Sequence, residues 1–111
     1  MDVKPLGGAL GAEIIGVDIR DPSEREVSDI RAALLEHEVV FFRETGIDDA
    51  GHLSFAGRFG TLSVFPVSKM MGETEPSLQP IVDGPDSPPS PDYWLTDVTW
   101  PAEPPPAGFL R

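Results

Sequence analysis

The chain has 111 residues, of which 40% are hydrophobic and 24% charged, the composition of a soluble globular protein with room for one small domain. Its net charge of −11 and sequence pI near 4.3 argue against nucleic acid and anionic membrane surfaces as partners, because both attract basic patches. The sequence contains no cysteine, which excludes disulfide bonds and thiolate chemistry.

Two further features concern location and organisation. No basic stretch followed by an apolar run opens the sequence, and no apolar segment approaches the ~20 residues that a membrane helix needs. We therefore expect a cytoplasmic protein. Most of the 13 prolines lie from Pro66 onward, which predicts an ordered α+β part over about residues 1–67 and a loop-rich part over about residues 68–111.

The first predicted strand covers residues 12–19 and follows a short apolar run at residues 3–6 that a glycine pair closes. Residues 12–19 are rich in β-branched side chains, which favour strands. Gly16 lies inside this run and indicates a bulge or a close approach of another backbone. An Asp-Pro pair at residues 21–22 then predicts a turn.

A helix is predicted from Ser23 to about His37. Ser23 and Glu26 form the S-x-x-E capping box, in which each side chain satisfies a free backbone N–H of the first turn. A cationic His37 is favoured by the helix dipole, so we interpret it as a helix-end residue rather than a metal ligand. The apolar residues of the helix recur at helical spacing and give it one apolar face: Val27, Ile30, Ala33 and Leu34.

The next predicted strand covers residues 38–43. Its four consecutive apolar residues, 39–42, predict burial on both faces, as in the central strand of a sheet. We also expect Phe41, Phe42 and the two tryptophans to lie in the core, since large aromatic side chains dominate protein interiors.

A second helix is predicted after a cap at Asp48 or Asp49, and Gly60 is expected just past its end. One side of this helix is apolar and carries Leu53, Ala56 and Phe59. His52 is expected on the solvated side, because no second ligand type stands near it at metal-binding spacing.

Short strands and long loops are predicted for the second half of the chain. The strands cover residues 62–67, interrupted by Pro66, and residues 79–82, and another strand is expected to begin at residue 108. Residues 68–77 are predicted to form a loop. Residues 83–92 are rich in Gly, Pro, Ser and Asp and are predicted to form another.

Five blocks stand in a fixed order along the chain. They are residues 5–18, His37-Glu38-Val39-Val40-Phe41-Phe42-Arg43, Phe55-Ala56-Gly57-Arg58-Phe59-Gly60, Trp94-Leu95-Thr96-Asp97-Val98-Thr99-Trp100 and Pro105-Pro106-Ala107-Gly108. In this order the blocks resemble the motifs of the taurine/2,4-D dioxygenase-like (TauD/TfdA) family. A single short block would carry little weight, but five ordered blocks over the whole chain are specific.

The resemblance implies a fold and a chemistry. The implied fold is α+β, the incomplete N-terminal portion of a double-stranded β-helix (jelly-roll) dioxygenase, with residues 1–111 as a single partial domain. The family uses Fe(II) and 2-oxoglutarate to hydroxylate a small organic acid, such as a sulfonate, a sulfate ester or an aryloxyacetate. The family's remaining strands, which carry a distal His ligand and the Arg that anchors 2-oxoglutarate, are expected beyond Arg111.

The resemblance also locates a metal strand at residues 93–100, where the family reads Trp-His-Thr-Asp and its His and Asp bind iron. Two residues one apart on a strand project to the same face and can supply two ligands of a 2-His-1-carboxylate triad. Asp97 is present as a residual ligand, but Leu95 occupies the His position and has no lone pair to give. For this chain alone we favour the other interpretation of Asp97, an Asp that accepts hydrogen bonds from nearby backbone N–H groups, since one ligand does not make a metal site.

Two more positions depart from the family pattern. Phe65, which precedes Pro66, stands where taurine-type members have a His that binds the sulfonate of the substrate. Tyr93 stands where an Asn often precedes the Trp of the metal strand. Both departures argue against taurine as the substrate, and the sequence identifies no certain catalytic residue and no cofactor-binding residue.

Two functions therefore remain open. The chain is a fragment of a dioxygenase that acts on a small organic acid, or it is a non-catalytic remnant or interaction module that pairs with a full-length relative. Ligand counting predicts no turnover by this chain alone, with Fe(II) and 2-oxoglutarate not bound by it. Apolar strands without all their neighbours predict a homo- or hetero-oligomer, or aggregation.

Overall fold

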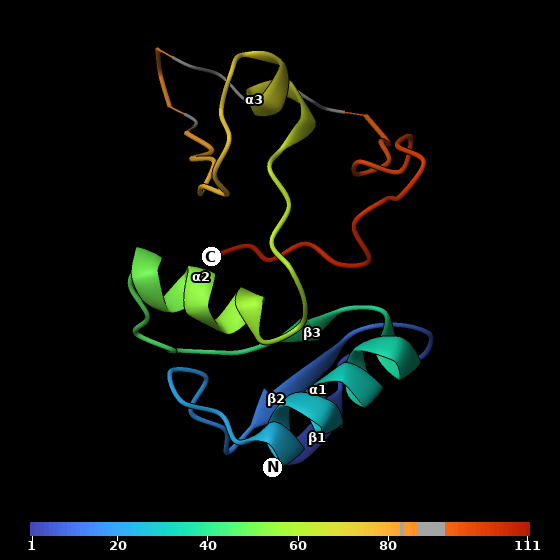
Figure 1. Ribbon diagram of the computed structural model, residues 1–111. Coiled ribbons are helices and arrows are strands. Elements are labelled where there is room, and N and C mark those ends of the chain that lie inside the picture. Colours follow the sequence, from blue (N-terminus) through green and yellow to red (C-terminus); the bar gives the residue numbers. More distant parts are fainter. Residues whose placement is uncertain (83, 87–92) are drawn as a thin grey trace. The chain divides into compact units, whose positions relative to one another are not determined.

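The computed structural model of the chain describes residues 1–82, 84–86 and 93–111 (Figure 1). It divides into two units, Met1–Leu62 and Ser63–Arg111, named the N-terminal and C-terminal units below. The N-terminal unit contains a three-stranded sheet and two helices: β1 (Asp2–Pro5), β2 (Ala12–Ile15), α1 (Glu24–His37), β3 (Val40–Phe41) and α2 (Asp49–Gly57). Among its described residues, the C-terminal unit contains one short helix, α3 (Pro66–Met70).

The sheet has the strand order β1-β2-β3, with β1 antiparallel and β3 parallel to β2. The apolar run at residues 3–6 therefore belongs to an opening hairpin with β2. The strand predicted over residues 12–19 is too long, since β2 ends at Ile15. Gly16 follows with a φ of +80°, a left-handed conformation that ends the extended backbone and that glycine adopts without strain.

The N-terminus of α1 confirms the predicted capping box. The Glu26 amide donates to Ser23 Oγ at 3.2 Å, and the Ser23 amide donates to Glu26 Oε2 at 2.8 Å. These two bonds satisfy donors that the first helical turn otherwise leaves free. The helix ends at His37, as predicted, where Glu38 takes a φ of +65° and its amide still donates to the Leu34 carbonyl.

One face of the sheet packs against α1 and forms the core of the N-terminal unit. Ala12 and Ile14 of β2 alternate with half-buried or exposed neighbours, as expected for a strand with one covered face. From α1, the buried residues are Val27, Ile30 and Ala33, while Leu34 is half-buried. The apolar stripe read from helical spacing is thus the stripe that meets the sheet.

The prediction of a central strand at residues 38–43 is wrong. Only two residues of this segment pair, and β3 is the last strand of the sheet. Val39 and Phe41 are 40% and 45% exposed. Phe42 leaves the strand and packs edge-to-face on Phe55 of α2, with ring centroids 5.5 Å apart.

The second helix, α2, begins as predicted, because the Asp48 side chain accepts the Gly51 amide at 2.8 Å. It ends at Gly57, earlier than predicted. The amides of Arg58 and Phe59 bond three residues back, to Phe55 and Ala56, in the tighter geometry of a 3₁₀ turn.

The predicted orientation of α2 is wrong. His52 is only 8% exposed, and Phe55 and Ala56 are buried with it. The buried stripe therefore has the spacing i, i+3, i+4 from residue 52, rather than running through residues 53, 56 and 59. Phe59 still packs on Phe55, at 5.2 Å between centroids.

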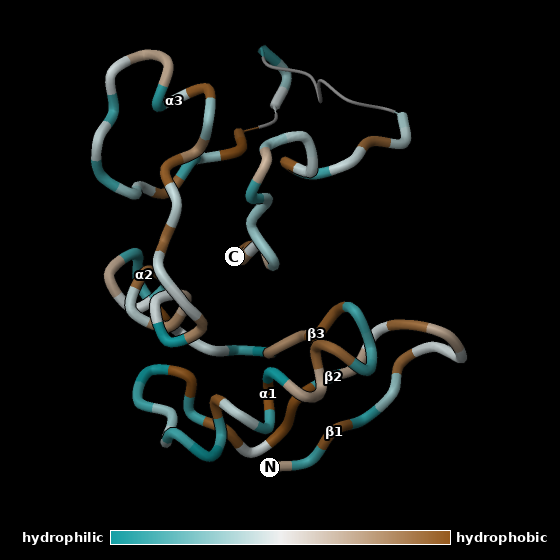
Figure 2. Tube along the Cα trace, turned by 45° about the vertical axis from the view of Figure 1, so that its right-hand side comes forward, coloured by the Kyte–Doolittle hydropathy of each residue, from teal (hydrophilic) through white to brown (hydrophobic). Residues whose placement is uncertain are grey.

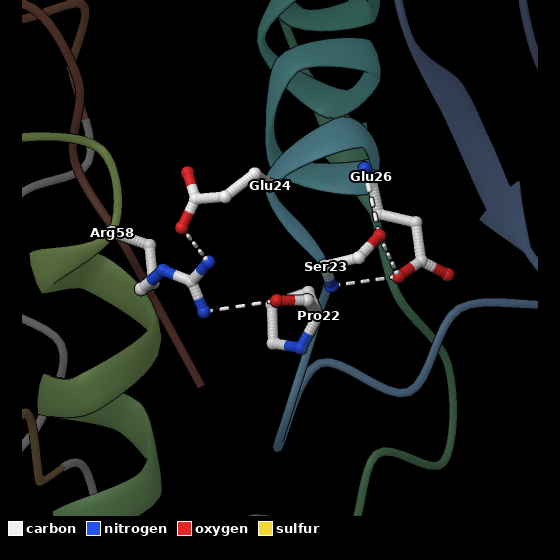
Figure 3. Close-up of polar contacts among 5 residues, drawn as sticks. All are labelled: Pro22, Ser23, Glu24, Glu26 and Arg58. Carbon is white, nitrogen blue, oxygen red and sulfur yellow. Dashed lines mark hydrogen bonds and ion pairs between the residues drawn. The ribbon is translucent and has the colours of Figure 1, made fainter.

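Two arginine side chains form hydrogen bonds that connect α1 and α2 within the N-terminal unit. Arg58 reaches from the end of α2 to the start of α1, where it donates to the Pro22 carbonyl at 2.9 Å and to Glu24 Oε1 at 2.6 Å (Figure 3). In the opposite direction, Arg31 of α1 donates to the Phe59 carbonyl at 2.7 Å and lies 5.8 Å from the centre of the Phe59 ring. Arg58 belongs to one of the five ordered blocks, and this role explains why an arginine is useful there.

Most of the strands predicted for the second half of the chain are not found among the described residues of the C-terminal unit. Pro66 does not interrupt a strand but occupies the first turn of α3, where its missing N–H costs nothing. Residues 79–82, 93–100 and 108–110 contain no strand in the described part of the chain. The predicted loop at residues 83–92 lies largely outside the described residues, which include only 84–86 of it.

The two tryptophans are not in a core. Trp94 is fully exposed, and Trp100 and Tyr93 are mostly exposed. The prediction that Phe41, Phe42 and the two tryptophans lie in the core is therefore wrong, since Phe41 is 45% exposed and Phe42 is half-buried.

Candidate functional site

The residues that the sequence singles out for metal binding lie in the segment 93–100 of the C-terminal unit. This segment runs without regular structure and bends at Asp97 and Val98. Val98 takes a φ of +47°, which is unusual for a β-branched residue and interrupts an extended backbone. The rule that places alternate strand residues on one face therefore does not apply to Leu95 and Asp97 here, and the predicted shared face is not formed.

Asp97 lies close to Gly108, which belongs to the Pro-Pro-Ala-Gly block, another of the five ordered blocks. A Cβ atom built on Gly108 would lie 3.6 Å from Asp97 Oδ2, an ordinary van der Waals contact. The Pro-Pro-Ala-Gly block thus returns the chain to the Asp97 carboxylate. The Asp97 side chain is exposed, so it is available to solvent and to ions.

Leu95 and the two predicted substrate positions are also exposed. Phe65 is 42% exposed and directly precedes α3, where its carbonyl accepts the Lys69 amide at 2.9 Å. Tyr93 and Leu95 are exposed to a larger extent. Among the described side chains, Phe65, Tyr93, Leu95 and Asp97 share no hydrogen bond or ion pair, so the structure does not gather them into one polar site.

The donor set at this segment does not fit Fe(II). A facial triad needs three ligands with lone pairs, and Leu95 has none. Among residues 1–82, 84–86 and 93–111, no three His, Asp or Glu side chains are grouped as metal ligands. Both histidines belong to helices of the N-terminal unit: His37 ends α1, as predicted, and His52 is buried in α2.

Two shallow clefts were not anticipated from the sequence. The first, of about 580 Å³, lies beside α3 in the C-terminal unit and includes Lys69 and Glu73 among its lining residues. Lys69 is not among the site residues predicted from the sequence, because it falls in a segment predicted to be a loop. The signal that was available is Pro66, a residue favoured in the first turn of a helix.

The second cleft lies in the N-terminal unit, between residues 13–20 and 42–45. Its two arginines are paired with carboxylates. Arg43 lies 3.3 Å from Glu13, and Arg20 donates to Asp18 through its guanidinium and its amide. The side-chain hydrogen bonds from Arg20 lower the pKa of Asp18 from 3.8 to about 2. Because each cation already has a partner, this cleft offers no strong attraction for a further anion.

Two features now describe the protein. The N-terminal unit is a small mixed sheet with two helices, and a later segment keeps the Asp, but not the His, of a His-x-Asp motif. Comparison with known proteins gives the family. Residues 2–111 match the family model described as "Taurine catabolism dioxygenase TauD, TfdA family". The chain therefore belongs to the TauD/TfdA family, and the resemblance read from its five blocks is confirmed.

Individual relatives agree with this assignment. The chain is 37% identical over 113 residues to an alpha-ketoglutarate-dependent sulfate ester dioxygenase of Pseudomonas putida, with 100% of this chain and 36% of the relative aligned. A crystal structure of a putative alpha-ketoglutarate-dependent taurine dioxygenase from Burkholderia xenovorans matches with 44% identity and a TM-score of 0.56, over 60% of this chain and 24% of that one.

A third comparison supports the fold alone. The crystal structure of AAD-2 in complex with Mn(II) and N-oxalylglycine is 24% identical, with a TM-score of 0.54 over 56% of this chain and 23% of that chain. Each of the two solved structures thus shares its fold with somewhat more than half of this chain. The chain spans little more than a third of the length of the curated relative that it matches. No helix in the described part of the chain is long and apolar enough to cross a membrane.

Proposed function

We propose that this chain is the N-terminal portion of a dioxygenase whose chemistry is the Fe(II)- and 2-oxoglutarate-dependent hydroxylation of a small organic acid, and that the chain does not catalyse this reaction by itself. Of the small organic acids, a sulfate ester is the substrate class that the relative from P. putida favours. Phe65 at the family's sulfonate-binding position argues against taurine, because a phenyl ring donates no hydrogen bond to an anion, but it does not by itself favour a sulfate ester, which is also an anion.

One observation carries the proposed lack of activity: the ligand position of the His-x-Asp motif is Leu95. Fe(II) would find the Asp97 carboxylate here, but a leucine side chain gives no second bond at the adjacent position. A metal ion held by one exposed carboxylate exchanges readily with water, since affinity rises with each ligand that the protein preorganises. In a complete site of this family, O₂ is the oxidant, and bound Fe(II) with 2-oxoglutarate would supply the electrons that activate it. What this chain contributes to that site is a carboxylate.

The test is succinate release by the purified chain with Fe(II), 2-oxoglutarate and O₂. We expect none above the protein-free control, from either the wild type or Leu95→His. Leu95 is mostly exposed, so the substitution leaves folding unaffected. It adds one imidazole, which gives two ligands where catalysis needs three and an anchor for 2-oxoglutarate.

A direct binding measurement separates ligand loss from other causes of inactivity. The absorption of bound Co(II) should increase only slightly for Leu95→His relative to the wild type, since the segment must rearrange before residues 95 and 97 can bind one ion together. It should not increase for the matched control Leu110→His, which adds the same side chain at another exposed position. Iron-dependent succinate production by the wild-type chain would contradict the proposal, because it would require ligands that Leu95 cannot provide.

A further inference from the structure

The cleft beside α3 contains none of the residues that the sequence singles out for metal or substrate binding. Its volume of about 580 Å³ lies within the range of small-molecule sites. Apolar and polar side chains alternate in this part of the chain, and Figure 2 shows brown and teal in close succession around α3. All lining residues belong to the C-terminal unit: Ser63, Val64, Lys69, Gly72, Glu73 and Thr74.

Lys69 is the cation of this cleft, and its ammonium group has no carboxylate partner among the described residues. The internal arginines of the N-terminal unit differ in this respect. Arg31 donates to a backbone carbonyl, and the others each form an ion pair: Arg20, Arg25, Arg43 and Arg58. Lys69 thus has three N–H donors to offer to a ligand that carries negative charge.

The backbone links Lys69 to Phe65. The Lys69 amide donates to the Phe65 carbonyl at 2.9 Å, so the two residues lie one helical turn apart. By the family resemblance, Phe65 stands where taurine-type members have a His that binds the sulfonate, and a phenyl ring cannot replace that donor. The chain therefore lacks a donor at residue 65 and has a charged one a single turn later.

The Glu73 carboxylate also lines the cleft and is the group there that would repel an anion. Its Oε2 atom accepts a hydrogen bond from Ser77 Oγ at 3.2 Å, and Ser77 is not among the lining residues. Lys69 and Glu73 are four residues apart but form no ion pair with each other in the described part of the chain. The positive charge of Lys69 is therefore not neutralised from within the cleft.

From these contacts we propose that Lys69 binds the anionic group of the substrate, and that the apolar body of a sulfate ester lies against Val64. The inference rests on the proposed function, because the substrate class is taken from it. A sulfate monoester carries one negative charge, which matches the single cation of the cleft. Ser63 and Thr74 place hydroxyl donors in the same cleft for further sulfate oxygens.

The test measures binding to the full chain without metal or 2-oxoglutarate. The probe is hexyl sulfate, kept below the concentration at which it forms micelles, and hexanol is its uncharged control. Binding is followed by NMR of the ¹⁵N-labelled chain. Hexyl sulfate should shift amide signals within residues 63–74, and hexanol should bind about threefold more weakly or less, because it lacks the charge that Lys69 attracts.

Substitutions of Lys69 separate its charge from its aliphatic side chain. Lys69→Met should weaken hexyl sulfate binding by about threefold to fivefold, whereas Lys69→Arg keeps the charge and should preserve binding. Lys4→Met, at an exposed lysine of β1, changes the net charge equally and should alter the affinity by less than about 1.5-fold. Lys69 is exposed, so these variants should fold, and their remaining amide signals verify it.

Glu73→Gln tests the sign of the charge that the cleft accepts. Removal of the like charge should tighten hexyl sulfate binding by about twofold. Weaker binding would overturn the assignment to a sulfate ester. Taurine is a second probe: its ammonium group replaces the apolar body, so it should bind more weakly than hexyl sulfate, and equal or tighter binding would assign the cleft to a zwitterion instead.

Three further results would overturn the inference: no amide shifts within residues 63–74, equal binding of hexanol and hexyl sulfate, or equal losses in Lys69→Met and Lys4→Met. The proposed function would survive each of these results, since its tests are succinate release and Co(II) absorption. Succinate release by this chain would contradict the proposed function and would leave a measured role of Lys69 in anion binding intact.

Discussion

The N-terminal and C-terminal units differ in the hydrogen bonding of their polar backbone groups and in the burial of their apolar side chains. In the N-terminal unit, β2 and α1 share a buried interface, both helices have side-chain caps, and two arginines join the helix ends. In the C-terminal unit, one five-residue helix is the regular structure among the described residues, and its largest aromatic side chains face solvent. The comparison teaches that family motifs alone do not order a segment: both units carry them, but the N-terminal unit also has a sheet on which α1 packs.

The largest expected effect comes from the core of the N-terminal unit. Ile30 is the large side chain that is fully buried, at 1% exposure. Ile30→Ala should lower the free energy of unfolding of this unit by ~2–5 kcal/mol, through lost burial and the cavity left behind. The measurement is urea unfolding followed by far-UV circular dichroism. Leu35→Ala, on the same helix but 79% exposed, is the control and should change stability by less than ~0.5 kcal/mol.

The arginine contact between the two helices gives the next largest effect. Arg58→Ala leaves the carbonyl of buried Pro22 without its donor, which should cost ~1–3 kcal/mol. The ion pair with Glu24 contributes little, because that carboxylate is almost fully exposed. Glu24→Ala should therefore cost far less than Arg58→Ala in the same urea experiment, and equal losses would assign the effect to the ion pair instead.

Removing the helix cap should have a smaller effect. Ser23→Ala deletes the acceptor for the Glu26 amide and should cost ~1 kcal/mol of unfolding free energy. Ser28→Ala changes the same residue type at an exposed position within α1 and serves as the control. It should be neutral or slightly stabilising, because alanine has the higher helix propensity. A loss at Ser28 as large as that at Ser23 would contradict a specific role of the cap.

A still smaller effect is expected from pH. Hydrogen bonds from Arg20 lower the pKa of Asp18 to about 2, so the native state favours the charged form. A depressed native pKa gives stability that is present above pH 3.8 and is lost as the pH falls toward 2. Because the Asp18 side chain is exposed to solvent, which screens the interaction, the loss should be slight. Thermal unfolding of Asp18→Asn and wild type should converge as the pH falls through this range, and a constant difference would contradict the linkage.

The unfolding of the two units can be followed separately with spectroscopic probes that the chain already contains. Both tryptophans and the single tyrosine lie in the C-terminal unit, while the two longer helices lie in the N-terminal unit. Tryptophan emission should resemble that of indole in water at all temperatures, because Trp94 is fully and Trp100 mostly exposed. The helix signal should melt cooperatively. Coincident transitions by both probes would mean that the two units unfold as one.

Local signals were sufficient for the features that depend on few residues. The capping box at Ser23, the cap at Asp48 and the end of α1 at His37 follow from residue types at fixed spacing, and the structure confirms each. Family membership also followed from sequence, because ordered blocks accumulate specificity that no single block has.

Features that depend on neighbours distant in sequence could not be predicted. An apolar run such as residues 39–42 indicates burial but not which partner supplies it, so β3 was placed at the centre of a sheet rather than its edge. His52 is predicted in solvent because no second ligand type stands near it at metal-binding spacing, but the packing of α2 buries it. At the candidate site, Leu95 and Asp97 were expected on a strand, but a strand requires a hydrogen-bonding neighbour that the segment 93–100 does not have in the described part of the chain.

The boundary at Leu62 has a consequence for protein synthesis. The sheet, both longer helices and the two arginine contacts of the N-terminal unit use only residues 1–62. A ribosome adds ~5–20 residues per second, whereas helices form within about a microsecond and domains generally fold as units during synthesis. The N-terminal unit can therefore fold while the segment with Leu95 and Asp97 is still being translated. During that interval Val39 and Phe41 are already partly exposed on the nascent chain, so a chaperone could meet these apolar side chains before the rest of the chain is complete.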